Sequence, residues 1–221
     1  MKILVIAAHA DDAEVSVGGT IAKLTQAGHE VKVMVAIIPC EDIDGIVSEE
    51  EGKKRRSECK ESAKILGTEL EILDLDPYQM WFKRDLVKTL DGKIREFSPD
   101  VVFTHWDHDS HQDHVAIANA TFAATRKNNA CLLMYEQMLG GVTPYAFKGN
   151  VFVDISSVME LKMQSIEAYH SQIARYGNWL EAIIGRAAFR GHQIGVRYAE
   201  TFEAVNMFFD IREEGILIRK L

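Results

Sequence analysis

Two short clusters of histidines and carboxylates hold the residue types in this chain that could do chemistry. The first cluster is His9-Ala10-Asp11-Asp12-Ala13-Glu14, and the second is Asp109-Ser110-His111-Gln112-Asp113-His114. Imidazoles and carboxylates without thiolates suit a catalytic zinc site, which uses three protein ligands and leaves a position for water. A spare carboxylate beside the ion can act as a general base. The two clusters together therefore predict a metal-dependent hydrolytic site.

The spacing within each cluster allows two side chains to face one ion. His9 and Asp12 are three residues apart, in a loop or in the first turn of a helix. His111 and His114 have the same spacing at the predicted start of a helix, so they share a face. Two imidazoles with one carboxylate favour zinc, although the same set also suits iron or cobalt.

Other members of the clusters have a functional and a simpler interpretation. Asp11 would lie beside the ion without ligating it, as a general base does. Asp113 could accept the second ring N–H of His111, which would fix its tautomer and favour its charged form. Alternatively, Asp11 or Asp12 could cap the following helix, and His114 could be a buried core histidine. It is the presence of both clusters, each after an apolar run, that favours the metal site.

Alternating apolar and amphipathic segments must position the clusters. Strands are predicted at 2–8, 30–38, 70–73, 101–104, 131–135 and 151–155, with a β-prone stretch at 201–211. Helices are predicted at 14–27, 51–66, 85–97, 111–126, 156–169 and 179–189, with Gly67 and Ser156 as caps. This alternation predicts a Rossmann-like α/β fold, with a mostly parallel sheet flanked by helices. Both clusters would then lie at the carboxyl ends of the strands, where such folds bind ligands.

The pair Gly18-Gly19 has a rival interpretation as a phosphate-binding loop, because a first strand–helix turn can cradle phosphate. These glycines fall inside the predicted helix and do not form a G-x-G-x-x-G pattern. Close packing of the helix against a neighbour is the favoured role.

Bulk composition limits the class of protein. The 221 residues are 47% hydrophobic and 26% charged with a net charge of −8, which fits one globular domain over 1–221. The negative charge argues against a general nucleic-acid binder, which needs a basic face. Three cysteines without paired spacing favour a reducing compartment. The first apolar run is too short for a signal peptide, and no segment approaches a membrane span. We therefore expect a cytoplasmic protein.

The motifs resemble those of a known family, the LmbE-like or PIG-L zinc-dependent de-N-acetylases. That family carries His-Pro-Asp-Asp-x-Glu after its first strand and a later Asp-x-His-x-Asp-His. Here Ala10 and Gln112 replace prolines of the family pattern, which removes no reactive group. The matching segments are His9–Glu14, Gly18-Gly19-Thr20, Arg55-Arg56-x-Glu58 through Gly67, Asp109–His114, Ser171-Gln172, and Arg190-Gly191 through Tyr198-Ala199-Glu200-x-Phe202.

The resemblance implies a role for each matching residue. The implied ligands of one zinc ion per chain are His9, Asp12 and His114. Asp11 is implied as the general base, and His111, with Asp113 behind it, as the charged group facing the oxyanion. The implied substrate contacts are Arg55, or the adjacent Arg56, and, within the family-like stretch, His192 and Tyr198.

The resemblance also implies the reaction, which is removal of the N-acetyl group from an N-acetylglucosamine-type conjugate. Two alternatives remain at this point: a metal-dependent amidohydrolase acting on another N-acyl substrate, and a non-catalytic α/β nucleotide-binding protein. Proteins of the family often form trimers or hexamers. Residues 136–200 carry many large apolar side chains, which could form a self-association surface or a continuous core.

Overall fold

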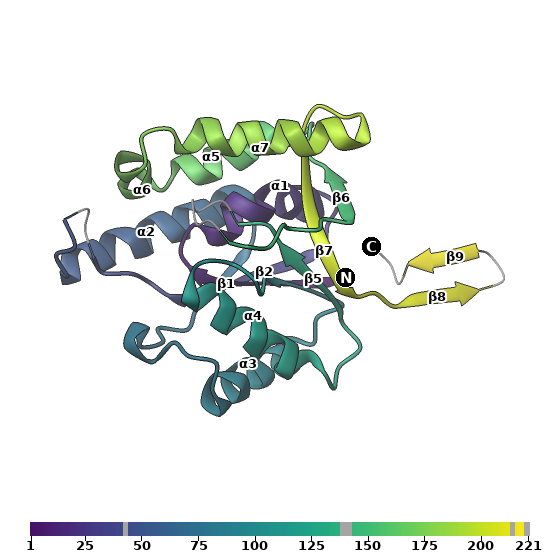
Figure 1. Ribbon diagram of the computed structural model, residues 1–221, viewed down its shortest axis with the longest axis horizontal. Coiled ribbons are helices and arrows are strands. Elements are labelled where there is room, and N and C mark those ends of the chain that lie inside the picture. Colours follow the sequence, from purple (N-terminus) through teal and green to yellow (C-terminus); the bar gives the residue numbers. More distant parts are fainter. Residues whose placement is uncertain (42–43, 138–142, 213–214, 219–221) are drawn as a thin grey trace.

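The computed structural model describes residues 1–41, 44–137, 143–212 and 215–218; for 209–212 and 215–218 it describes the backbone alone. Within this part of the chain, seven strands form one sheet in the order β3-β2-β1-β4-β5-β7-β6 (Figure 1). The strands are β1 (Lys2–His9), β2 (Glu30–Ile37), β3 (Glu69–Ile72), β4 (Val101–His105), β5 (Cys131–Tyr135), β6 (Val151–Asp154) and β7 (Ala199–Asn206).

The first five strands are parallel, and β7 lies antiparallel between β5 and the edge strand β6. The prediction of a mostly parallel α/β sheet is therefore confirmed. From β1 the chain proceeds to β2 on one side, whereas β4 pairs with β1 on the other side. The strand order thus reverses between β1 and β4, and a ligand crevice forms at the carboxyl ends of strands at such a point.

Helices cover both faces of the sheet (Figure 1). One face packs against α1 (Asp12–Gln26), α2 (Glu49–Leu66), α5 (Met159–Glu167) and α7 (Trp179–Ile194). The other face packs against α3 (Arg84–Phe97) and α4 (Gln112–Thr125). Two short helices, η1 (Pro77–Gln79) and α6 (His170–Arg175), lie in the connections.

The buried strands explain why the prediction of this sheet was successful. β1 and β5 are apolar along almost their whole length, and their side chains are nearly all buried. A parallel strand with both faces covered has no polar side, so its sequence is a continuous run of apolar residues. Gly67 ends α2 with φ of 69°, a left-handed conformation that glycine adopts without steric cost.

The prediction for residues 156–169 was partly wrong. The helix there begins at Met159 with Val158 as its N-cap residue, not at Ser156. The Ser156 hydroxyl instead accepts a hydrogen bond from the backbone N–H of Tyr198, at 3.0 Å. The short helix α6 was not predicted, and α7 continues five residues beyond the predicted end at Phe189, to Ile194.

The pair Gly18-Gly19 lies inside α1, where it packs closely against neighbours. A Cβ atom on Gly19 would lie only 2.7 Å from the Ile155 side chain. The backbone N–H groups of Gly19 and Thr20 donate to the Glu200 carboxylate, which is also paired with the buried Lys162. These contacts join α1, α5 and β7, and they confirm close packing as the role of the glycines.

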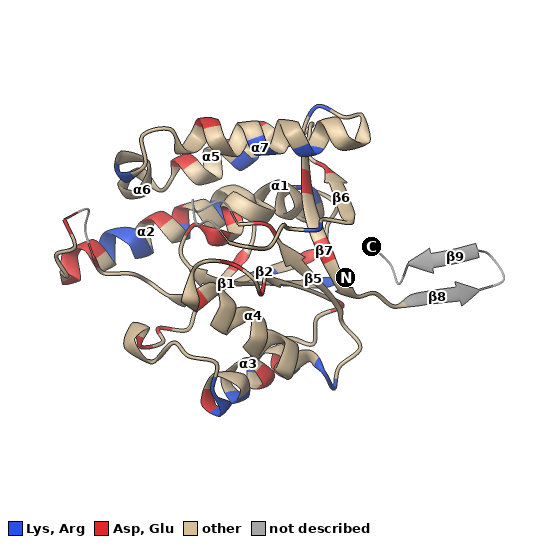
Figure 2. Ribbon diagram, in the orientation of Figure 1, with Lys and Arg blue, Asp and Glu red and all other residues tan. Residues whose placement is uncertain are grey.

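Beyond β7, the backbone of β8 (Phe209–Arg212) pairs with that of β9 (Gly215–Ile218) in a separate antiparallel hairpin. Positively and negatively charged residues are both spread over the helices and strands (Figure 2). No described helix has the length and apolar character needed to cross a membrane.

Candidate metal centre and active site

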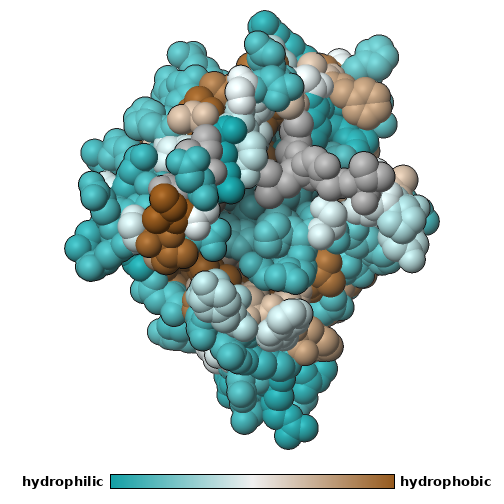
Figure 3. Space-filling model, turned by 60° about the vertical axis from the view of Figure 1, so that its left-hand side comes forward, coloured by the Kyte–Doolittle hydropathy of each residue, from teal (hydrophilic) through white to brown (hydrophobic). Residues whose placement is uncertain are grey.

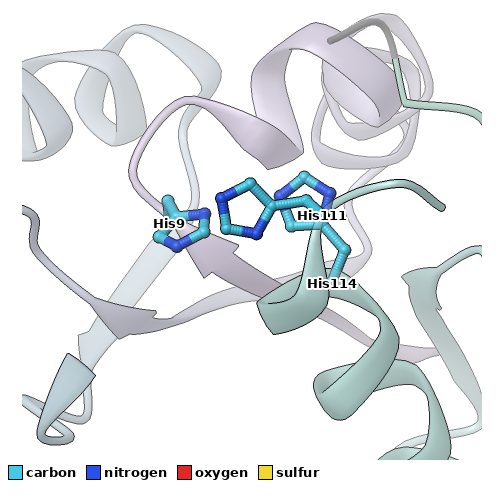
Figure 4. A group of neighbouring side chains, drawn as sticks. All are labelled: His9, His111 and His114. Carbon is cyan, nitrogen blue, oxygen red and sulfur yellow. The ribbon is translucent and has the colours of Figure 1, made fainter. Parts of the chain in front are cut away.

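The two clusters meet at the carboxyl edge of β1 and β4, as their positions after buried strands predicted. His9 is the last residue of β1, while His111 and His114 lie at the start of α4. The three imidazole rings point toward one another (Figure 4). The ring centroid of His9 lies 4.8 Å from that of His111 and 5.4 Å from that of His114. The fold therefore brings together residues that are about a hundred positions apart in the chain.

Asp12 is the buried carboxylate at the centre of the cluster. Its Oδ2 accepts the backbone N–H of His9 at 2.7 Å and lies 3.5 Å from His9 Nδ1, while its Oδ1 lies 3.5 Å from His114 Nε2. Burial by itself would raise the pKa of Asp12, but His114 and His105 outweigh it and hold that pKa well below its usual range. Asp12 is therefore an ionised carboxylate facing two imidazoles, which is a suitable ligand for a cation.

His114 has one ring nitrogen engaged and one free. Its Nδ1 faces Asp109 Oδ2 at 3.0 Å, whereas the fully buried Nε2 has no hydrogen-bond partner among the described residues. A buried polar atom without a partner requires an explanation. Carboxylates that bind the second ring nitrogen of a histidine are typical of metal ligands, because they fix the tautomer that presents the other nitrogen. The free Nε2 therefore fits a metal ion beside Asp12.

Two overlapping groups of described side chains could hold such an ion, namely His9, His111 and His114, and Asp12, His105 and His114. His105 is fully buried, and its Nε2 already accepts the backbone N–H of Ala8 at 2.9 Å. Burial and the neighbouring His114 lower the pKa of His105 to about 4, and the ring nitrogen that faces Asp12 has its lone pair occupied by the Ala8 N–H. This argument removes His105 and leaves His9, Asp12 and His114, with His111 beside them.

Asp113 does not form the predicted hydrogen bond with the ring of His111. Its Oδ2 lies 2.9 Å from His9 Nε2, and the Asp113 backbone N–H donates to His111 Nδ1 at 3.2 Å. Burial, together with His114 and His9, lowers the pKa of His111, whereas the prediction was a stabilised charged form. In His9, burial is outweighed by Asp113 and Asp12, which raise its pKa to about 10. A cation at His9 must therefore displace a proton.

Asp11 precedes α1 with φ of 87°, a left-handed conformation that is strained for most residues but tolerated by Asp and Asn. Its side chain makes no capping hydrogen bond, so the simpler interpretation as a helix cap does not apply. Burial and the charges of Asp12 and Glu14 raise the pKa of Asp11 well above its usual value. The turn thus presents a carboxylate of increased basicity to the site.

A cleft of about 640 Å³ opens over this cluster. It is bordered by His9, Asp11, Asp12, His111 and Asp113, by the segment after β2, by α2, by the segment after β3, and by α6 with Trp179. Figure 3 looks onto this side of the molecule, which is mainly hydrophilic with separate hydrophobic patches. A cleft of this volume, lined by both charged and apolar side chains, suits a small-molecule ligand.

Both candidate arginines border the cleft, each with a partner. Arg55 is 7% exposed, and it donates to the Glu41 carbonyl at 2.8 Å and to the Glu51 carboxylate at 3.4 Å. The more exposed Arg56 pairs with Asp74 through its two terminal guanidinium nitrogens. Arg55 therefore supports the segment after β2, while the Arg56–Asp74 pair offers both charge signs to a ligand.

His192 and Tyr198 do not border the cleft. His192 is exposed near the end of α7, and the Tyr198 carbonyl accepts the backbone N–H of Ile155. The family-like stretch that contains Tyr198 holds the fold together, because Glu200 binds backbone N–H groups in the middle of α1 and Phe202 packs on Phe103. The described cleft therefore does not include His192 or Tyr198, and their contact with substrate stays a prediction.

Sequence reasoning assigned no role to Asp109 or Gln137, which support the site together with His105. Asp109 orients His114, and His105 packs face to face on its ring with centroids 4.0 Å apart. Gln137 donates to Asp12 Oδ1 and accepts a hydrogen bond from Ser16. The available signal for Gln137 was its position just after β5, at the same sheet edge as the clusters.

Known proteins match the chain along most of its length. The family described as GlcNAc-PI de-N-acetylase, or PIG-L, matches residues 4–125. The diacetylchitobiose deacetylase of Thermococcus kodakarensis is 31% identical, over 94% of this chain and 84% of that protein. The 4-oxalmesaconate hydratase of Pseudomonas putida is 25% identical, over 91% of this chain and 88% of that protein.

Among solved structures, the N,N'-diacetylchitobiose deacetylase from Pyrococcus horikoshii superposes with a TM-score of 0.75 at 27% identity, over 92% of this chain and 83% of that chain. The family match spans more than half of the sequence, and it contains every residue of the two clusters. The chain therefore belongs to the PIG-L, or LmbE-like, family of de-N-acetylases.

Proposed function

We propose that this protein is a zinc-dependent hydrolase that removes the acetyl group from an N-acetylglucosamine-type amino sugar conjugate. The observation that carries the proposal is the unpartnered Nε2 of His114, held beside the ionised Asp12 and His9. The similarity to diacetylchitobiose deacetylases supports the substrate class. Zinc bound by these three residues would polarise the acetyl carbonyl and acidify a water molecule.

Asp11 is the general base in this proposal. Its raised pKa and its position at the cleft suit a carboxylate that accepts a proton from the attacking water and then delivers it to the leaving amine. An amide needs that second transfer, because an unprotonated amine is a poor leaving group.

His111 is the group that stabilises the negative charge on the carbonyl oxygen. Its Nδ1 accepts the Asp113 N–H, so the Nε2 position is left to donate into the cleft. Such donors contribute most when they are fixed before charge develops. Asp113, which binds His9, is proposed to orient a metal ligand and not the oxyanion group.

The test is a screen for acetate and free amine with N-acetylglucosamine, its glycosides and short chitooligosaccharides as substrates. We expect hydrolysis by zinc-loaded protein, loss after removal of metal by a chelator, and recovery on adding zinc. His114→Ala should abolish metal binding, measured by elemental analysis of the purified protein. Stoichiometric metal without hydrolysis of any amino sugar, but with hydrolysis of other N-acyl compounds, would favour the alternative amidohydrolase.

A further inference from the structure

One side chain from outside the two clusters reaches the centre of the metal site. Gln137 lies directly after β5, and its Nε2 donates to Oδ1 of the buried Asp12. Its Oε1 accepts a hydrogen bond from the hydroxyl of Ser16 in α1. Gln137 lies outside the border of the described cleft, so it is not placed to touch a substrate. Its contribution to the site therefore passes through Asp12.

The orientation of the Gln137 amide follows from its two partners. A carboxylate that binds a metal ion must be ionised, and an ionised carboxylate can only accept hydrogen bonds. The amide must therefore turn its NH2 group toward Asp12, since the reverse orientation would place two acceptors against each other. Its oxygen then faces the buried Ser16, whose hydroxyl is free to donate. The two hydrogen bonds thus select one orientation of the amide.

The two backbones that carry Gln137 and Ser16 are joined by Arg186 of α7. Its Nη1 donates to the Glu136 carbonyl and its Nη2 to the Val15 carbonyl, each at 2.7 Å. Glu136 directly precedes Gln137 in the chain. Val15 directly precedes Ser16 within α1. One guanidinium therefore sets the spacing between two backbones whose following side chains bind each other.

Two further cations hold the same backbones. Arg190 binds the Glu136 carboxylate through Nε, at 2.9 Å, and through Nη2. The buried Lys162 donates to the Val15 carbonyl at 2.8 Å. Lys162 belongs to α5 and Arg190 to α7. The position of Gln137 is therefore fixed by helices that lie behind the metal cluster and carry none of its ligands.

The two oxygens of Asp12 are bound by different parts of the fold. Oδ2 accepts the backbone N–H of His9 at the end of β1, at 2.7 Å, and Oδ1 accepts the amide N–H of Gln137 after β5. Because each oxygen has its own donor, rotation of the carboxylate about its Cβ–Cγ bond breaks at least one hydrogen bond. The carboxylate is therefore oriented before an ion binds, which favours metal affinity.

We propose that Gln137 is a positioning residue for Asp12, which holds this carboxylate in the orientation that the metal ion requires, and that Ser16 acts on the ion only through Gln137. The inference rests on the proposed metal site and is independent of the substrate. Gln137 is 125 positions away from Asp12 and outside the family match over residues 4–125. Neither cluster motif contains it.

The test measures the dissociation constant of Co2+ by titrating the metal-free protein and following visible absorption, since these bands depend on the geometry of the ligands. Gln137→Met keeps a similar shape and removes both hydrogen bonds. We expect it to weaken cobalt binding by about 10–100-fold and to shift the absorption bands. Ser16→Ala leaves the amide in place but less constrained, and should weaken binding by about 2- to 10-fold.

The double variant separates positioning from a general loss of stability. If Ser16 acts through Gln137, then Ser16→Ala weakens binding in the parent background and has no further effect in the Gln137→Met background. Equal factors in the two backgrounds would contradict this order of action. The comparison uses dissociation constants alone, so it does not depend on which compound the protein hydrolyses.

Asn206→Leu is the matched control, because Asn206 carries another amide that binds β5. Its Oδ1 accepts the backbone N–H of Leu132 at 2.8 Å, toward the other end of the strand from Gln137. This variant should unfold at lower urea concentration but keep the cobalt affinity and absorption bands of the parent. Parent-like affinity in Gln137→Met, or an equal loss in Asn206→Leu, would overturn the inference alone. A parent that binds no metal would overturn the metal site together with it.

Discussion

At the scale of single residues, the site depends on which carboxylate binds a ring nitrogen of each histidine proposed as a metal ligand. His114 faces Asp109 and His9 faces Asp113, so each proposed imidazole ligand is held by one carboxylate. The sequence motif placed Asp113 two residues from His111 and suggested that those two would interact. Only the fold shows that the carboxylate reaches across to the end of β1, because spacing along the chain does not report contacts between elements.

Replacing Asp11 tests the general base. Asn tolerates the same left-handed backbone and has nearly the same shape, but it cannot accept a proton. We expect Asp11→Asn to retain its metal and to lose about 10²–10⁴-fold in kcat. The measurement is kcat with metal content determined on the same sample. Turnover near the parent rate would assign the proton transfer to another group.

Replacing His111 tests whether this residue stabilises the oxyanion or binds the metal. His111→Ala should keep one metal per chain and lose about 10²–10³-fold in kcat. Elemental analysis beside steady-state kinetics distinguishes the two roles. If the metal is lost together with activity, the ion is held by the group His9, His111 and His114.

The two orienting carboxylates should affect metal affinity rather than fold. We expect Asp109→Asn and Asp113→Asn each to weaken metal binding by about 10–100-fold, since each orients an imidazole ligand. Competition with a chromophoric chelator measures the affinity. If Asp113 acted on His111, Asp113→Asn would instead leave the affinity of the parent and reduce only kcat.

At the scale of elements, the helices and strands that could be predicted from the sequence are those with clear patterns of buried residues or a clear end signal. The central strands were predicted because their apolar runs have no polar face, and α2 because Gly67 marks its end. The helix α6 was missed because its six residues, His170–Arg175, are too few to show a helical period. Ser156 was misassigned as a cap because its true partner, Tyr198, lies 42 residues away.

The contact of α1 with the segment after β6 is testable through its glycines. Gly19→Ala places a methyl group against Ile155, and overpacking of this kind costs about 1–3 kcal/mol in free energy of unfolding. Gly92→Ala is the control, because Gly92 lies exposed within α3 with nothing near its Cβ position; it should gain about 0.5–1 kcal/mol. The measurement is the midpoint of urea-induced unfolding, compared between the parent and each variant under the condition that their m-values are equal.

At the scale of the whole molecule, α7 carries several exposed apolar side chains of the segment proposed to self-associate. Ile184, Phe189 and Ile194 are 37%, 58% and 40% exposed, whereas Trp179 and Ile183 are buried. Residues 138–142 of the same apolar segment lie outside the described part of the chain. A single copy thus leaves part of this apolar load uncovered, which favours association between copies.

We therefore expect a homo-oligomer, a trimer or hexamer, at micromolar concentration. Light scattering coupled to size-exclusion chromatography should give a multiple of 24.9 kDa, and Phe189→Glu should reduce it. Lys60→Glu, a change of charge on an exposed face of α2, is the control for surface charge alone. If the parent protein has the mass of a single chain, the exposed side chains on α7 do not form an interface between copies.

The cleft joins two stretches of chain that contribute different groups to it. The groups proposed to react, such as His9, Asp11 and His114, all lie within residues 4–125, the region that the family shares. The wall formed by Arg175, Tyr176 and Trp179 comes from a later stretch, tied to the first by the Glu58–Ser171 contact. Substitutions at Arg175, Tyr176 and Trp179 would therefore change the border of the cleft and leave the groups proposed to react in place. Exchange of residues 173–179 between homologues is thus a direct route for evolution, or for an engineer, to redirect the enzyme to new conjugates.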